Sequence, residues 1–143
     1  MSRSGYSDDC DGDVNLYRGA VDKALKGKRG QAFLKELLDT LNALPEKKLI
    51  ANSFKTSDGD VCALGAIAVK RGIDTKILEK YENDDVWGLG KIFGIADSMA
   101  AEIMFENDDD FGYRKTAETS EERFARIRAW VVKNITNQEL ITP

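Results

Sequence analysis

The sequence contains no histidine, only two cysteines and only two prolines. The absence of histidine excludes Ser-His and Cys-His catalytic pairs, imidazole metal ligands and an imidazole base at neutral pH. Two cysteines far apart in the chain form neither a disulfide framework nor a structural zinc site. We therefore expect Cys10 and Cys62 to be free thiols, with Cys62 serving as a small buried side chain.

The sequence also lacks a long apolar stretch and a strong charge of one sign. No window approaches the roughly 20 apolar residues of a membrane span, and the first residues have no apolar signal segment. We expect a cytoplasmic protein that makes no contact with a membrane. The net charge of −4 is modest, and no basic patch is obvious, so nucleic acid is not an expected partner.

A chain of 143 residues can bury a hydrophobic core large enough to fold without disulfide bonds or a structural metal ion. We expect one domain, 1–143, in which residues 1–12 are a flexible acidic head. The predicted fold class is mainly α (α+β), a compact helical domain of five to six helices with one small β-hairpin. The hairpin is expected within residues 49–63, because Asp58-Gly59 is typical of a tight turn between two strands.

The helices are predicted from apolar periodicity and end signals. The first spans residues 14–26 and ends at Gly27. The second begins near Arg29 or Gly30, runs to residue 44, and is separated from the first by a tight basic turn without the Walker spacing. The most apolar run, residues 62–72, predicts a central buried helix ended by Gly72, and residues 73–81 predict a short amphipathic helix. A capping box at Thr119 and Glu122 starts the last helix, whose buried stripe is Phe124, Ile127, Val131 and Ile135.

Residues 86–103 fit the pattern of a helix-turn-helix unit, with Gly94 at the turn. Charge argues against DNA binding, because no lysine or arginine lies between residues 96 and 112. A recognition helix must approach phosphates, and this segment would be repelled. We interpret it as an α-helical hairpin, and a helix-turn-helix DNA-binding regulator stays as the first alternative.

The acidic segment is the predicted partner-binding surface. Its acids, next to Met104 and Phe105, would steer a protein with a basic surface, while the aromatic residues supply affinity. In the opposing interpretation the aromatics are buried and the acids only keep the protein soluble. The candidate residues are Asp97, Glu102, Glu106, Asp108, Asp109, Asp110 and Phe111. The basic residues of the last helix, Arg123, Arg126, Arg128 and Lys133, are either solvated, complementary to this segment, or a second contact surface.

Six stretches of the chain resemble a family of small phage and prophage proteins with no assigned activity. The stretches are residues 2–9, 27–34, 58–66, 93–96, 106–108 and 128–131. The resemblance spans nearly the whole chain. It implies a viral or prophage setting, and it supplies no catalytic residue.

Together these features predict a phage-encoded, non-enzymatic protein-binding module that modulates a host or phage protein. We assign no catalytic residue, no metal ligand and no cofactor. An enzyme based on carboxylates or on a metal ion stays as the second alternative, because the separation of acids in space is not visible in a sequence.

Overall fold

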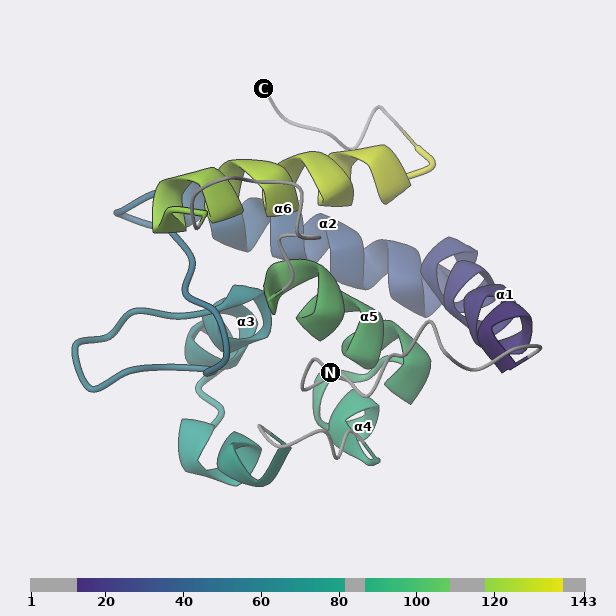
Figure 1. The fold of residues 1–143 in the computed structure, drawn as a ribbon, viewed down its shortest axis with the longest axis horizontal. Helices are drawn as coiled ribbons and strands as arrows, with labels where there is room; N and C mark the ends of the chain where they lie inside the picture. Colours follow the sequence, from purple (N-terminus) through teal and green to yellow (C-terminus); the bar gives the residue numbers. More distant parts are fainter. Residues whose placement is uncertain (1–12, 82–86, 109–117, 138–143) are drawn as a thin grey trace.

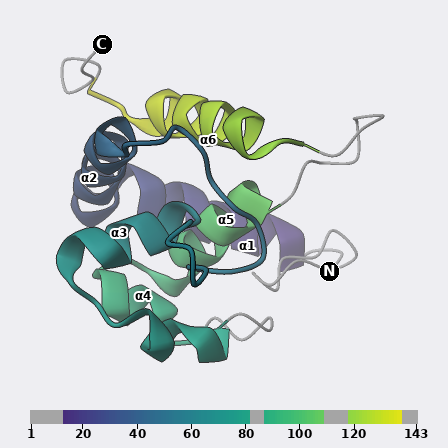
Figure 2. The ribbon, with the colours of Figure 1, turned by 90° about the vertical axis from the view of Figure 1, so that its left-hand side faces the viewer.

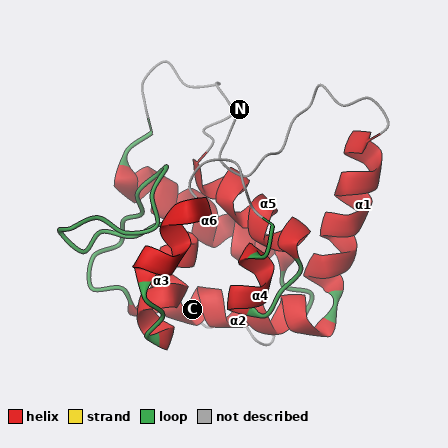
Figure 3. Cartoon of the chain, turned by 90° about the horizontal axis from the view of Figure 1, so that it is seen from below, coloured by secondary structure: helices red, strands yellow, loops and turns green. Residues whose placement is uncertain are grey.

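The computed structural model describes residues 13–81, 87–108 and 118–137, and in these ranges it is helical, as predicted. Figure 3 shows helices joined by loops, with no strand in the described ranges. The predicted acidic head, 1–12, lies outside the described residues. In chain order the elements are α1 (Asp13–Lys26), α2 (Lys28–Ala43), α3 (Ala63–Arg71), the 3₁₀ helix η1 (Thr75–Tyr81), α4 (Leu89–Phe93), α5 (Asp97–Asp108) and α6 (Ser120–Asn134).

Helix α5 lies in the middle of the molecule. It contacts α1, α3, α4 and α6, while α2 contacts α1, α3 and α6. Figures 1 and 2 show α2 and α6 side by side along one face, with α5 beneath them and α1 at one end. The leucine stripe predicted for the second helix, which also included Leu44, supplies much of the core; Leu44 follows the end of α2 and is half-buried, and the other four members are fully buried. These are Leu34, Leu37, Leu38 and Leu41.

The apolar run predicted as a buried helix is α3. Leu64 and Ile67 are 1% and 0% exposed, which confirms that this helix is buried, whereas the central position predicted for it belongs to α5. The helix begins at Cys62, whose Sγ accepts a hydrogen bond from the Gly65 N–H at 3.4 Å. It ends at Gly72 with a φ of 73°, a left-handed conformation that glycine adopts without strain. Cys62 is a buried free thiol, and Cys10 lies outside the described residues.

The predictions for the last helix and for residues 73–81 have different outcomes. The capping box of α6 is present, with the Glu122 N–H donating to Thr119 Oγ1 and the Thr119 N–H donating to Glu122 Oε1. The four residues of its predicted stripe are buried. The short helix expected at 73–81 is a 3₁₀ helix, Thr75–Tyr81, that starts where Asp74 accepts from the Lys76 N–H at 2.9 Å.

The predicted β-hairpin is wrong. Residues 49–63 fold back at Asp58-Gly59, and Gly59 has the expected positive φ of 90°, yet they form only one isolated bridge, Lys55 to Val61. The two arms share a few backbone hydrogen bonds, such as the Ile50 N–H to the Val61 carbonyl at 2.9 Å, but other elements take up further backbone groups of this loop. Asn107 of α5 accepts from the Ala63 N–H and donates to the Ile50 carbonyl, and the Leu49 N–H donates to the Ser120 carbonyl. A buried side-chain amide therefore replaces part of a strand ladder.

Candidate functional site

The junction of α1 and α2 is the best-formed candidate site, and we call it the basic elbow. Helix α1 ends at Lys26 and α2 begins at Lys28, so Gly27 alone separates them, as the predicted tight turn requires. The elbow carries Lys23, Lys26, Lys28 and Arg29 and no acid between them. All four side chains are exposed.

Close packing fixes the angle between the two helices. Gly30 is buried, and a Cβ atom at this position would lie 1.9 Å from the Ala24 carbonyl oxygen. Gln31 joins three segments, because its Nε2 donates to the carbonyls of Leu25 at 2.7 Å and Asn134 at 2.9 Å. Its Oε1 accepts from the Thr136 N–H at 2.9 Å. The elbow is therefore rigid without any ligand.

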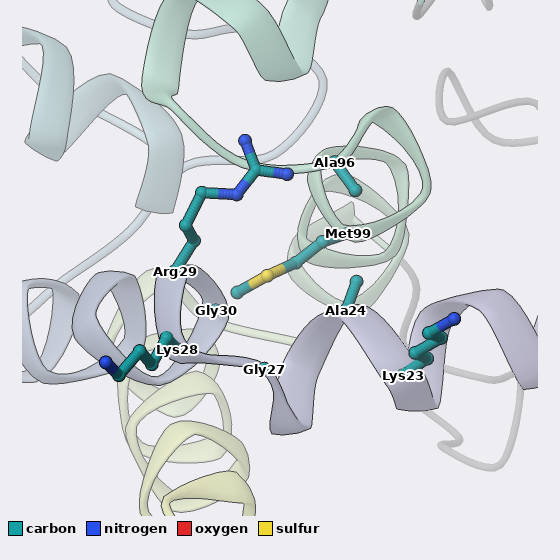
Figure 4. Close-up of a pocket in the computed structure, with 8 residues that line it drawn as sticks. All are labelled: Lys23, Ala24, Gly27, Lys28, Arg29, Gly30, Ala96 and Met99. Carbon is teal, nitrogen blue, oxygen red and sulfur yellow. The ribbon is translucent and has the colours of Figure 1, made fainter.

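A pocket of about 370 Å³ lies in the angle of the elbow. Figure 4 shows Met99 of α5 pointing toward Gly30, and Arg29 extending from α2 toward the loop that carries Ala96. Lys23 and Lys28 lie on opposite flanks. The pocket thus has an apolar floor, formed by Ala24, Ala96 and Met99, and a cationic rim of Lys23, Lys28 and Arg29, in which the two lysine side chains extend outward, away from Met99.

The cations of the elbow lack partners within the described fold, whereas arginines elsewhere are paired. Lys23, Lys28 and Arg29 make no ion pair or hydrogen bond with the part of the chain that the structure describes. Arg71, by contrast, pairs with Glu36 at 2.5 Å, donates to the Phe93 carbonyl and lies over the Phe33 ring. Hydrogen bonding to Arg71 lowers the pKa of Glu36. The charge of Arg71 is used within the fold, while that of Arg29 is free to meet a partner.

The position of Lys28 and Arg29 in α2 is unfavourable for folding. They occupy the first turn, which contains no acid, and Gly27 supplies no side-chain cap. The amino end of a helix carries partial positive charge, so cations there are destabilising by a few tenths of a kcal/mol to about 1 kcal/mol each. Residues that are kept at positions where they destabilise a helix are typical of functional surfaces.

The described acids of the predicted partner-binding segment do not form one exposed surface. Asp97 caps the start of α4, accepting from the Gly88 N–H at 3.1 Å and the Gly90 N–H at 2.8 Å. Glu102 is buried and paired with Arg18, and Glu106 is half-buried. Asp108 accepts from the Asn52 N–H at 3.0 Å. Asp109, Asp110 and Phe111 lie outside the described residues.

The apolar anchors expected beside these acids are not exposed either. Met104 is 1% exposed and Phe105 is half-buried. Helix α5 alternates acids with apolar residues, and a sequence does not show whether such acids have buried partners. Arg18 of α1 is such a partner for Glu102, and Arg126 of α6 donates to the main-chain carbonyl of Glu106.

The same burial bears on the helix-turn-helix alternative. Gly94 forms the expected turn between α4 and α5, with a φ of 77°. A recognition helix must present an exposed face to the major groove. Helix α5 instead contacts four other helices and buries both its apolar residues and Glu102. The geometry of this unit is that of an α-helical hairpin in the core.

The basic residues of α6 are largely used inside the molecule. Arg126 pairs with the buried Glu118 at 2.7 Å and donates to the Glu106 carbonyl. Arg123 lies 3.3 Å from the same Glu118 carboxylate, and Arg128 donates to the side chain of Asn42 at 2.8 Å. These arginines hold α6 against its neighbours, which leaves the elbow as the stronger candidate for an external contact.

Sequence reasoning treated residues 27–30 as a turn only and missed the elbow as a site. A usable signal was present, because four cations fall within residues 23–29 and the first turn of α2 holds no acid. What the sequence did not show was that Ala96, in the loop before α5, and Met99 of α5 would lie beneath these cations.

The fold and site together define a helical protein with a basic pocket at an interhelical elbow. Within the described ranges, no helix has both the length and the apolar character to span a bilayer. Comparisons with protein-family models, with curated proteins and with solved structures find no match for this chain.

Proposed function

We propose that the protein is a non-enzymatic binding module whose contact surface is the basic elbow and whose partner is an acidic segment of another protein. The observation that carries this proposal is the cationic rim of Lys23, Lys28 and Arg29 around a pocket of about 370 Å³ with an apolar floor. Cations with no internal partner, held on a rigid frame, attract and orient an anionic ligand without first breaking bonds within the fold.

The floor of the pocket favours a peptide over a nucleic-acid backbone. Ala24, Ala96 and Met99 suit the methylenes of a glutamate or an adjacent apolar side chain, while the rim meets the carboxylate. A phosphodiester backbone has no such apolar part. The net charge of −4 would also oppose the long-range approach of nucleic acid.

The proposal reverses the charge of the partner expected from the sequence, since the acids of α5 serve folding. The proposed setting is a phage or prophage protein in the host cytoplasm, acting on a host or phage protein. That setting is supported by the resemblance of the sequence alone, and the surface assignment is supported by the geometry alone. The two parts of the proposal can therefore fail separately.

Binding can be measured by fluorescence anisotropy with a labelled peptide rich in glutamate and leucine. The double variant K28E/R29E should weaken binding by about tenfold or more, because it replaces two attractions with two repulsions. The matched control K55E/K76E changes two exposed lysines outside the elbow and should bind like the unaltered protein. Added salt should weaken binding of the unaltered protein.

Two results would contradict the proposal. One is equal binding by K28E/R29E and K55E/K76E, which would remove the elbow from the contact. The other is that random-sequence duplex DNA displaces the peptide at lower concentration than unlabelled peptide does. That outcome would make nucleic acid the preferred ligand class.

A further inference from the structure

Two glutamates of α5 form a pair inside the molecule, apart from the elbow. Glu102 and Glu106 are four residues apart, so they lie on the same face of the helix. Glu102 is 1% exposed, and its Oε1 lies 2.7 Å from Arg18 Nη1 of α1. Its Oε2 is buried and has no hydrogen-bond donor within the described residues.

Glu106 lies one helical turn beyond Glu102 on the same face of α5, and the charge of Glu102 and a side-chain hydrogen bond with it both raise the pKa of Glu106. Two ionised carboxylates cannot hydrogen-bond to each other, because neither has a proton to donate. A single proton on Glu106 would let it donate to the Glu102 carboxylate, one oxygen of which has no donor within the described residues, and would remove the repulsion between the two groups. An unsatisfied buried carboxylate oxygen is costly, so the geometry favours the protonated pair.

We propose that Glu102 and Glu106 are a proton-binding pair, in which one shared proton closes the junction of α1, α5 and α6 and the loss of that proton loosens it. The charged groups around Glu106 are Glu102 on its own helix, Arg18 on α1 and Arg126 on α6. Burial raises the pKa of Glu106 to about 7, and the charge and hydrogen bond of Glu102 act in the same direction. Arg126 and Arg18 act in the opposite direction.

The direction of the pH effect follows from linkage. The pKa of Glu106 is about 7 in the folded protein and near its ordinary value of 4.5 in the unfolded chain. The folded state therefore holds a proton that the unfolded chain has released. The stabilisation is fully present below pH 4.5 and is lost as the pH rises through about 7.

The pair lies where α5 anchors two other parts of the chain. Arg126 of α6 donates to the main-chain carbonyls of Glu106 and Asn107. The side chain of Asn107 holds the loop that contains Ile50 and Ala63. Repulsion between Glu102 and Glu106 therefore acts on the end of α5 that carries both attachments, and this end should open first.

The lack of histidine makes the proposal easy to test. With no imidazole in the chain, no side chain with an ordinary pKa titrates between about pH 5.5 and pH 7.5. Thermal unfolding at pH 5.5 and pH 8.5 should show that the folding equilibrium constant falls by roughly 3- to 30-fold, after allowance for the partial exposure of Glu106. The corresponding loss in Tm is about 2–8 °C.

The variant E106Q carries an amide that can donate to Glu102 at any pH. It should lose most of the pH dependence and should be more stable than the unaltered protein at pH 8.5. The control E121Q removes an exposed acid of α6 and should keep the pH dependence. An unchanged pH dependence in E106Q would overturn the proposal.

Carbon-13 NMR of the glutamate side chains gives a second readout that does not depend on a variant. One carboxyl titrating near pH 7 in the unaltered protein supports the proton-binding pair. Titration of every glutamate below about pH 5.5 would overturn it, whatever the behaviour of E106Q.

Discussion

The basic elbow and the carboxyl-terminal half of α5 each gather charges of one sign, and the fold treats them in opposite ways. At the elbow, Lys28 and Arg29 are exposed and make no bond with the described chain. In α5, Glu102 is buried against Arg18, and Glu106 is half-buried beside it. Charge in a sequence therefore predicts a binding surface only when no partner within the fold neutralises it. The comparison predicts that substitutions of the elbow cations weaken partner binding, whereas substitutions of the buried charges lower stability.

The largest effect is expected at the frame of the elbow. G30A places a Cβ atom 1.9 Å from the Ala24 carbonyl oxygen, which is main chain and cannot rotate away. We expect a loss of about 3 kcal/mol or more in the free energy of unfolding, measured by urea denaturation. The control G19A lies at an exposed position of α1 with no atom within 4 Å. It should gain about 0.5–1 kcal/mol, and equal stability of the two variants would show that the elbow is not closely packed.

The second effect concerns the buried charges. E118Q removes the carboxylate that Arg126 and Arg123 share, at 2.7 Å and 3.3 Å. Two partly buried guanidinium groups would then lack their counterion, so we expect a loss of about 2–4 kcal/mol. E121Q, an exposed acid of the same helix, should change stability by less than about 0.5 kcal/mol. A loss in E118Q no greater than that in E121Q would mean that α6 is held by its apolar stripe alone.

A smaller effect is expected for Gln31, which joins the elbow to the end of α6. Q31A removes the bonds to the Leu25 and Asn134 carbonyls and to the Thr136 N–H. Because these bonds are only partly buried, we expect a loss of about 1–3 kcal/mol and weaker binding of the acidic peptide. Q31E keeps the acceptor but places a carboxylate oxygen against the Leu25 and Asn134 carbonyls, so its stability should be no higher than that of Q31A. A stability of Q31A within error of the unaltered protein would contradict the joining role.

Most helices could be predicted from the sequence because local signals determined them. The leucine periodicity of α2, the Thr119 and Glu122 box of α6 and the terminal Gly72 of α3 depend on residues close together in the chain. The hairpin failed because its competitor, Asn107, lies 44 residues beyond Ala63. Nothing local to residues 49–63 shows that a side chain of α5 will take up their backbone groups.

The candidate site was predictable only in part, for the same reason. The cations at 23–29 are visible in the sequence, but their lack of partners and the apolar floor from Ala96 and Met99 depend on tertiary packing. The acids of α5 are equally visible, and their partner Arg18 lies 84 residues before Glu102, which no periodic pattern connects. A sequence shows where charges of one sign cluster, but it does not show which of them are paired with opposite charges from distant parts of the chain.

The smallest expected effect is a gain in stability on replacing Lys28 and Arg29, whereas most substitutions destabilise a protein. Lys28 and Arg29 lie in the first turn of α2, where the helix dipole opposes cations. K28E/R29E should therefore stabilise the protein by about 0.5–1.5 kcal/mol at low salt, and the gain should shrink as salt screens it. The same variant should lose binding of the acidic peptide, so stability and binding would move in opposite directions. Chemical denaturation at two salt concentrations measures the change in stability. K55E/K76E, which changes net charge by the same amount but leaves the first turn of α2 unaltered, is the control for net charge. A destabilised K28E/R29E would show that these cations support the fold, and the elbow would then have no surplus charge to offer a partner.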